Sequence, residues 1–267
     1  MALPVALQLY SVRDELAKDF FGTIKKVKEM GYDGVELSGL AGLDEKEVRK
    51  MLDEVGLEVM SSHAPYAEML EEGELERYVE VGCRYVVVPW MKFDDPDTEV
   101  PENIEIIRKI AKRAKELGLI LCYHNHNFEF ADYKGKFILD TIYDSISPDL
   151  LQTQIDTCWA RYGGVDPAEY VLKYSGRAPL VHLKDYVGGE SGDETPYELI
   201  GHTQRGNRPT SFKFVPVGHG CQDMPSILAA AQKAGAEWVI VEQDSSLDRP
   251  TLEAAAMSIE YLHSFEW

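Results

Sequence analysis

The chain has 267 residues, of which 45% are hydrophobic and 27% are charged, and this composition is typical of a folded globular protein. Its formal net charge is −19, from 46 acidic and 27 basic residues, and it has no basic stripe of the kind that nucleic-acid binding requires. No run of about 18 apolar residues occurs, so the sequence predicts neither a membrane span nor a membrane partner.

The N-terminal segment and the cysteines predict a cytoplasmic location. Residues 1–15 lack a basic region and run directly into a strand-like pattern, so no signal peptide is expected. The four cysteines are scattered and form no CxxC pair. This spacing favours reduced thiols over a disulfide framework or a cysteine zinc site.

Eight short apolar segments alternate with longer amphipathic segments along the chain. Most of the short segments are rich in β-branched residues through their middles, as is typical of parallel strands that helices cover. The predicted strands are residues 5–10, 34–37, 58–64, 85–90, 119–127, 151–157, 180–185 and 238–244.

Amphipathic helices are expected between these strands. Residues 20–31, 45–56 and 104–118 repeat apolar side chains at spacings of three and four, and each segment ends in a glycine that can cap a helix. Residues 225–235 end in the same way. Eight strand–helix repeats predict a parallel sheet with right-handed crossovers.

The chain length fits one α/β domain, a (β/α)₈ TIM barrel over residues 1–267. A doubly wound open sheet is the alternative, but it favours a glycine-rich phosphate turn that this sequence lacks. A long irregular segment, about residues 187–216, follows the seventh predicted strand and far exceeds the usual connection of about 2–6 residues. We expect it to be a lid or an oligomer contact; an idle surface loop is the alternative.

Polar side chains occur where nearly every predicted strand ends. In a TIM barrel these ends meet at one face, which holds the active site. The residues are Gln8 and Tyr10, Glu36, His63, His124, His126 and Glu129, Asp156, His182 and Lys184, and Glu242 and Asp244. The strand period of two places His182 and Lys184 on one face, and likewise Glu242 and Asp244.

Three of these residues predict a divalent-metal site. Burial of Asp156, His182 and Glu242 without partners would be costly because the charged groups would leave water uncompensated. A shared cation removes this cost. Carboxylates and an imidazole without a thiolate suit Mn²⁺, Mg²⁺ or Co²⁺, with Zn²⁺ as a further option. Strand parity does not decide whether His124 or Glu129 is the ligand from the fifth strand.

Motifs along the whole chain resemble those of the xylose isomerase-like TIM barrel superfamily, in the branch of sugar phosphate isomerases and epimerases. They are LQLYSVRDE at 7–15, GYDGVEL at 31–37, SSHAP at 61–65, YHNHNFEF at 123–130, QIDTCWARYGGVDP at 154–167, VHLKD at 181–185, VPVGHG at 215–220 and VEQD at 241–244. The branch contains keto-sugar 3-epimerases, hydroxypyruvate isomerase, inosose dehydratase and 3-keto-glycoside lyases.

The resemblance implies one metal ion, held by an acidic residue after strand five, an Asp after strand six, a His after strand seven and a Glu after strand eight. Asp156, His182 and Glu242 match, and Glu129 is chosen for strand five, with Mn²⁺ as the expected ion. Keto-sugar epimerases instead carry a glutamate nearer the position of His124. We therefore expect Glu129→Gln to weaken metal binding more than His124→Ala, because a hard cation favours a carboxylate. Endonuclease IV shares the barrel, but it requires more histidines and a basic face.

The expected chemistry is proton transfer next to a carbonyl through a metal-stabilised enediolate. Glu242 is the expected base, and Glu129 or His126 returns the proton or assists departure of a hydroxyl. The residues expected to bind substrate are His63, Lys184, His124, Trp159, Gln8 and Tyr10. Lys184 could instead form a structural ion pair with Asp185 or Glu36, and the aromatic residues could belong to the core.

The expected partner is a small sugar or polyol without a phosphate, because no arginine cluster is present. A sugar isomerase or epimerase is the main functional prediction. A metal-dependent dehydratase or lyase acting on an inosose or a 3-keto-glycoside is the alternative, since the same enediolate can expel a β-substituent. A non-catalytic sugar-binding barrel is the third, and the paired carboxylates argue against it. Relatives of this branch are often dimers or tetramers.

Overall fold

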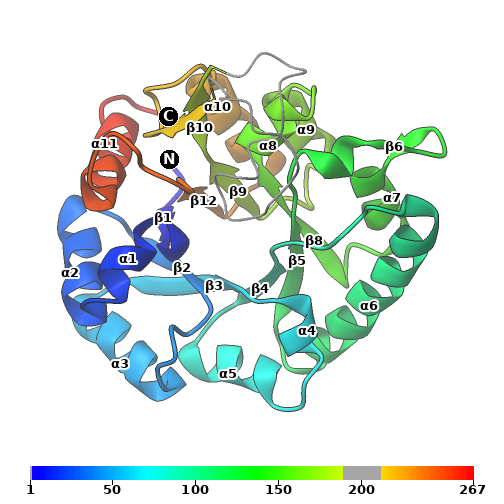
Figure 1. Ribbon diagram of the computed structural model, residues 1–267. Helices are drawn as coiled ribbons and strands as arrows, with labels where there is room; N and C mark the ends of the chain where they lie inside the picture. Colours follow the sequence, from blue (N-terminus) through cyan, green and yellow to red (C-terminus); the bar gives the residue numbers. More distant parts are fainter. Residues whose placement is uncertain (1, 189–211) are drawn as a thin grey trace.

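Eight parallel strands close into a barrel that a ring of helices surrounds (Figure 1). The computed structural model describes residues 2–188 and 212–267. The barrel strands, in chain order, are β1 (Val5–Gln8), β2 (Gly34–Ser38), β3 (Glu58–His63), β4 (Tyr85–Val88), β5 (Ile120–His124), β8 (Leu151–Asp156), β9 (Leu180–Leu183) and β12 (Trp238–Val241). Strand β12 pairs with β1 and closes the barrel, so the predicted TIM barrel is confirmed.

The helices follow the strands as the amphipathic segments predict. The longer ones are α2 (Phe20–Met30), α3 (Glu45–Val55), α5 (Glu74–Val81), α6 (Pro96–Glu116), α7 (Ile138–Ser145), α9 (Pro167–Lys173), α10 (Met224–Ala234) and α11 (Thr251–His263). Short helices α1 (Arg13–Leu16), α4 (Tyr66–Met69) and α8 (Thr157–Tyr162) lie between them. Gly56 ends α3 in the left-handed conformation with φ 78°, as expected of a glycine cap. Helix α6 begins eight residues earlier than predicted, because Pro96 fits its first turn.

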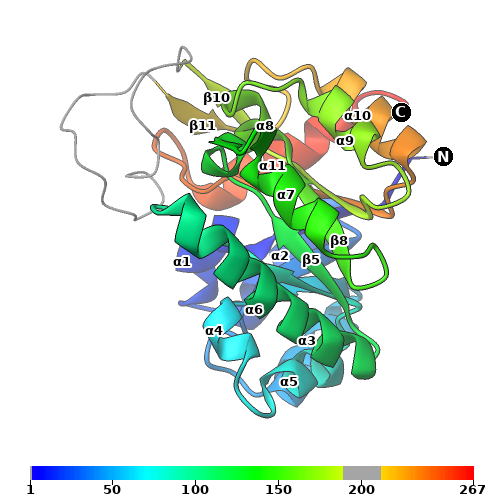
Figure 2. The same ribbon diagram turned by 90° about the vertical axis from the view of Figure 1, so that its right-hand side faces the viewer.

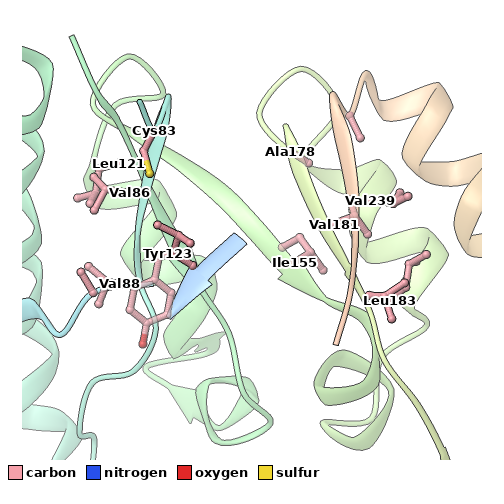
Figure 3. Close-up of a cluster of buried hydrophobic side chains, with 14 of the residues drawn as sticks. Cys83, Val86, Val88, Leu121, Tyr123, Ile155, Ala178, Val181, Leu183 and Val239 are labelled. Atoms are coloured by element: carbon pink, nitrogen blue, oxygen red, sulfur yellow. The ribbon is translucent and has the colours of Figure 1, made fainter. Parts of the chain in front are cut away.

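Successive residues of each strand alternate between the barrel interior and the helix layer. In β4, Val86 and Val88 face the outer core, where Figure 3 shows them, whereas Tyr85 and Val87 belong to the inner cluster. The inner cluster comprises Ala6, Met60, Tyr85, Val87, Cys122, Leu180, Trp238 and Ile240. These apolar side chains fill the barrel interior towards the end where the strands begin, which is called the lower part below, as is usual for this fold.

Several strands end before the polar residues that the sequence assigns to them. Tyr10 lies in a 3₁₀ helix, η1 (Leu9–Val12), and Glu129 lies in another, η2 (Phe128–Phe130). Glu242 and Asp244 follow the end of β12. The strand period of two therefore does not apply to these four residues, which include the predicted pair Glu242 and Asp244.

The predicted insertion at 187–216 begins and ends in paired backbone. Strand β10 (Asp185–Val187) pairs antiparallel with β11 (Lys213–Val215). A second small sheet joins β6 (Asp132–Tyr133) to β7 (Lys136–Phe137). The predicted lid or oligomer contact falls mainly on residues 189–211, which lie outside the described residues.

Both ends of the described chain lie at the end of the barrel where the strands begin. Figure 2 places them on the right, whereas β10 and β11 lie towards the left. Pro4 and Trp267 line the same surface cleft at this end. Within residues 2–188 and 212–267, no helix combines the length and the apolar character needed to cross a bilayer.

Arg177 joins the end of α7 to the start of β8. Its guanidinium donates hydrogen bonds to the carbonyl oxygens of Tyr143 at 2.8 Å, Ile146 at 2.8 Å and Leu151 at 3.0 Å. The nearby Lys173 makes one ion pair, at 2.6 Å to Asp140, and its side chain is 47% exposed.

We predict that Arg177→Met lowers the free energy of unfolding by about 2–3 kcal/mol, because three carbonyl groups lose a charged donor. Lys173→Met is the control and should cost less than about 1 kcal/mol, as expected of an exposed ion pair. Urea denaturation measures both. Equal losses in the two variants would show that Arg177 does not hold these elements together.

Candidate metal centre and active site

The buried carboxylate of Glu36 lies inside the barrel, where polar side chains replace the apolar inner cluster. The donors to this carboxylate are Gln8 Nε2 at 2.8 Å, Ser61 Oγ at 2.5 Å, Gln154 Nε2 at 2.6 Å and His182 Nε2 at 2.7 Å. His63 Nε2 lies 3.2 Å away. Burial alone would raise the pKa of Glu36, but the charges of His63 and His182 hold it well below its usual range.

Gln154 connects Glu36 to two histidines. Its Oε1 atom lies 2.7 Å from His63 Nε2 and 2.9 Å from His124 Nδ1. The sequence analysis offered Glu36 as a possible ion-pair partner of Lys184. The structure corrects this interpretation, because side-chain donors from four other strands surround the carboxylate.

Four buried side chains close to the Glu36 carboxylate form a group suited to a metal ion. One ligand atom each from His124, Asp156, His182 and Glu242 lies within 4.8 Å of the others. Asp156 Oδ2 is fully buried and forms no hydrogen bond of suitable geometry among the described residues, although Lys184 Nζ lies 3.0 Å away. A buried carboxylate oxygen in this state suits metal coordination. A second group of three histidines replaces the two carboxylates with His63.

Lys184 provides the positive charge beside these carboxylates. Its Nζ atom lies 3.0 Å from Asp156 Oδ2, 2.9 Å from Glu242 Oε2 and 3.0 Å from Asp244 Oδ2. Burial alone would lower the pKa of Lys184, but the three carboxylates raise it well above its ordinary value. These contacts favour the cationic form of Lys184, which suits it to donate hydrogen bonds. The predicted ion pair of Lys184 with Asp185 or Glu36 is not found.

The backbone next to Lys184 is held by Asp185. Its carboxylate accepts hydrogen bonds from the backbone N–H groups of Tyr186, Gly218, Gly220 and Gln222, at 2.9–3.2 Å. A Cβ atom on Gly220 would lie 2.1 Å from Asp185 Oδ1, so this close approach requires glycine. The Gln222 amide also donates to the carbonyl oxygen of Lys184 at 3.2 Å.

A cavity of about 380 Å³ opens above the candidate metal group. Its volume is within the range of small-molecule sites. The lining residues are Tyr10, Ser38, Gly39, His63, Pro65, Glu68, Pro89, Trp90, His124, His126, Lys184, Glu242 and Asp244. The structure thus brings Tyr10, His63, His126 and Lys184 of the predicted site to one pocket.

Three predicted site residues lie outside both this pocket and the four-residue group. Gln8 is buried below it and bonds to Glu36. Trp159 is buried beside Phe212 and Phe214, with ring centroids 6.3 Å and 5.7 Å away. Neither residue lines the cavity, and the burial of Trp159 is in keeping with the core alternative.

Glu129 is the third predicted residue outside both the pocket and the four-residue group. Its carboxylate is fully buried and accepts hydrogen bonds from the Tyr123 hydroxyl at 2.9 Å and from the backbone N–H of His126 at 2.8 Å. Burial raises the pKa of Glu129 to about 8. Glu129 does not belong to the four-residue group, whereas His124 does. The geometry therefore favours His124 as the ligand from β5.

Sequence reasoning missed two residues that shape the site. Asn125 donates to the carbonyl oxygen of Asp156 at 3.3 Å and accepts from its backbone N–H at 3.0 Å, and so ties β5 to Asp156. Gln154 precedes Asp156 by two residues, so strand parity alone places it on the same face. No comparable signal in the sequence indicates Asn125.

Comparison with known proteins agrees with this geometry. The profile described as "Xylose isomerase-like TIM barrel" matches residues 24–265. The chain belongs to this family. The predicted resemblance is confirmed over nearly the whole sequence.

Individual proteins are similar to this chain over most of its length. The chain is 27% identical to an inosose dehydratase of Geobacillus kaustophilus, over 90% of this chain and 85% of the relative. A sugar phosphate isomerase/epimerase of Parabacteroides distasonis superposes with a TM-score of 0.79 at 23% identity, over 99% and 94% of the two chains. The IolI protein, solved with a zinc atom, gives a TM-score of 0.74 at 13% identity, over 97% and 96%. These two structural likenesses support the fold alone.

We predict that His124→Ala weakens zinc binding more than Glu129→Gln does, the reverse of the order expected from the sequence. Loss of His124 removes a ligand atom, whereas Glu129→Gln alters a group that lies outside the cluster. Removal of an outer-shell partner typically lowers metal affinity by about 10–100-fold, and the loss of zinc affinity in His124→Ala should be larger. Competition with a chelator measures both affinities. A larger loss for Glu129→Gln would return the ligand role to Glu129.

Proposed function

We propose that the chain is a metal-dependent dehydratase that removes water from an inosose or a related cyclic keto-polyol. The observation that carries the proposal is the buried group of His124, Asp156, His182 and Glu242 at the base of a pocket of small-molecule size. Similarity to an inosose dehydratase over most of both chains supports dehydration. The proposal takes the alternative from the sequence analysis in place of the isomerase.

Two imidazoles and two carboxylates would hold the ion. This donor set suits Mn²⁺, Co²⁺ or Zn²⁺ better than Mg²⁺, because imidazole favours the transition metals. A bound divalent ion would act as a Lewis acid on the substrate carbonyl and would stabilise the negative charge that develops there.

The protein side chains would move the protons. Glu242 belongs to the four-residue group and lines the pocket. Its pKa is held well below its usual range, because burial opposes ionisation but Lys184 and His182 favour it. In its ionised form it would accept the α-proton of the substrate. His126 lines the same pocket and would donate a proton to the departing β-hydroxyl group. Lys184 would donate a hydrogen bond to a substrate oxygen.

The position of Glu129 also supports elimination over epimerisation. An epimerase removes a proton from one face of the substrate and returns a proton to the other face. In this chain the carboxylate from the β5 end is buried away from the pocket, and Glu242 and Asp244 both follow β12. Elimination requires one base and one acid, and Glu242 and His126 provide them.

Incubation with an inosose and Mn²⁺, Co²⁺ or Zn²⁺ tests the proposed reaction. Dehydration next to the carbonyl should yield a conjugated enone or its diketone tautomer, which proton NMR and ultraviolet absorbance detect. An isomeric ketose without loss of water would support the isomerase instead. An unchanged substrate in the presence of bound metal would overturn the proposal for this substrate class.

We predict that Glu242→Gln lowers turnover by about 10²–10⁴, as is typical for loss of a positioned general base. The amide keeps the size and one oxygen atom of the carboxylate, but it cannot accept a proton at neutral pH. Exchange of the substrate α-proton in D₂O measures proton removal directly. Glu237→Gln is the control, because Glu237 pairs with Arg84 at the other end of the barrel. Exchange at the wild-type rate in a metal-loaded Glu242→Gln enzyme would mean that another residue is the base.

A further inference from the structure

Hydrogen bonds join Glu36 and Gln154 to the candidate ligands His124 and His182, and the donor and the acceptor of each bond can be assigned. We propose that Glu36 and Gln154 are positioning residues that select which ring nitrogen of His182 and of His124 binds the metal. The selected atoms are Nδ1 of His182 and Nε2 of His124. This inference rests on the proposed metal site and concerns two residues that the sequence analysis does not place among the metal ligands.

The orientation of the Gln154 amide follows from its contact with Glu36. An ionised carboxylate only accepts hydrogen bonds, so the Gln154 atom that lies 2.6 Å from Glu36 Oε2 must be the NH₂ group. The Gln154 carbonyl oxygen must then face His63 and His124, at 2.7 Å and 2.9 Å. A flipped amide would place its oxygen against the carboxylate.

The Gln154 carbonyl oxygen in turn fixes the tautomer of His124. This oxygen can only accept, so His124 Nδ1 must carry the hydrogen atom. An imidazole that binds a metal ion is neutral, so this ring then has no hydrogen atom on its other nitrogen. The lone pair is therefore on Nε2, which lies 3.8 Å from Asp156 Oδ2 on the side of the metal group.

Glu36 fixes His182 directly. Its Oε1 atom accepts from His182 Nε2 at 2.7 Å, and this contact turns Nε2 away from the candidate metal group. The other nitrogen, Nδ1, lies 2.8 Å from the carboxylate oxygen Oε2 of Glu242, another candidate ligand, and it would give up its hydrogen atom on binding the metal. A histidine that donates one N–H to a carboxylate and binds metal through its other nitrogen is a common arrangement in metal sites.

One carboxylate thus selects a different nitrogen in each ring. Its action on His182 is direct, and its action on His124 passes through the Gln154 amide. Removal of such outer-shell partners typically lowers metal affinity by about 10–100-fold. A purely structural role for Glu36 and Gln154 would lower stability without changing which nitrogen binds.

Long-range ¹⁵N–¹H NMR of histidine-labelled protein, with and without Zn²⁺, tests the inference without measuring activity. In the zinc-loaded wild type, we expect the hydrogen on Nδ1 of His124 and on Nε2 of His182. The opposite nitrogen in either ring would overturn the inference. Absence of zinc binding by the wild type would instead refute the proposed metal site, so the two failures are distinguishable.

Substitutions separate the direct action of Glu36 on His182 from its action on His124 through Gln154. Gln154→Met should lower zinc affinity by about 10–100-fold and release the His124 tautomer while that of His182 is kept. Glu36→Gln should disturb both rings, because an amide NH₂ group then faces hydrogen-bond donors. The double variant Glu36→Gln/Gln154→Glu should restore the tautomers and most of the affinity, since it reverses the direction of the shared hydrogen bond. Unchanged affinity and tautomers in folded Gln154→Met would overturn the role of Gln154.

Ser61→Ala is the matched control. Ser61 donates to Glu36 at 2.5 Å but contacts neither histidine ligand. We expect this variant to lose some stability and to keep both tautomers. Circular dichroism verifies that each variant is folded, and the wild-type NMR experiment decides the assignment even if Glu36→Gln does not fold. A change of tautomer in Ser61→Ala equal to that in Glu36→Gln would indicate a general packing effect and overturn the inference.

Discussion

The burial of the Glu36 carboxylate is the constraint on which the polar centre of the barrel depends. An ionised carboxylate inside a protein is costly unless hydrogen bonds and positive charges surround it. Here the surrounding groups come from β1, β3, β8 and β9, so they meet only when the barrel has closed. Correct strand register and assembly of the candidate site are therefore the same event.

Much of the fold and part of the site follow from sequence periodicity. The eight strands are short and apolar, and the helices between them show the spacing of amphipathic segments. Strand parity brings His182 and Lys184 to the same interior face, and Asp156 joins them from β8. These predictions succeed because a closed parallel barrel gives every strand the same inward and outward alternation.

Sequence reasoning is weaker where the alternation of strand residues gives no information. The alternation of strand residues predicts that Gln8 points into the barrel, but it does not predict how deep Gln8 lies along the barrel axis. In the structure, Gln8 lies below the pocket and contacts Glu36. Glu129 follows the end of β5 in a 3₁₀ turn, where local hydrogen bonds determine its direction. Trp159 packs against Phe212 and Phe214, which are more than 50 residues away in the chain. Such contacts depend on the whole fold and leave no local pattern.

The placement of the two chain ends has a practical consequence. They line a common cleft at the end of the barrel where the strands begin, and the pocket opens at the other end. A tag, a fused domain or a solid support attached at either end would therefore leave the pocket entrance clear. The proximity of the ends also makes the barrel suited to circular permutation, in which a short linker joins them and the chain is opened at another loop.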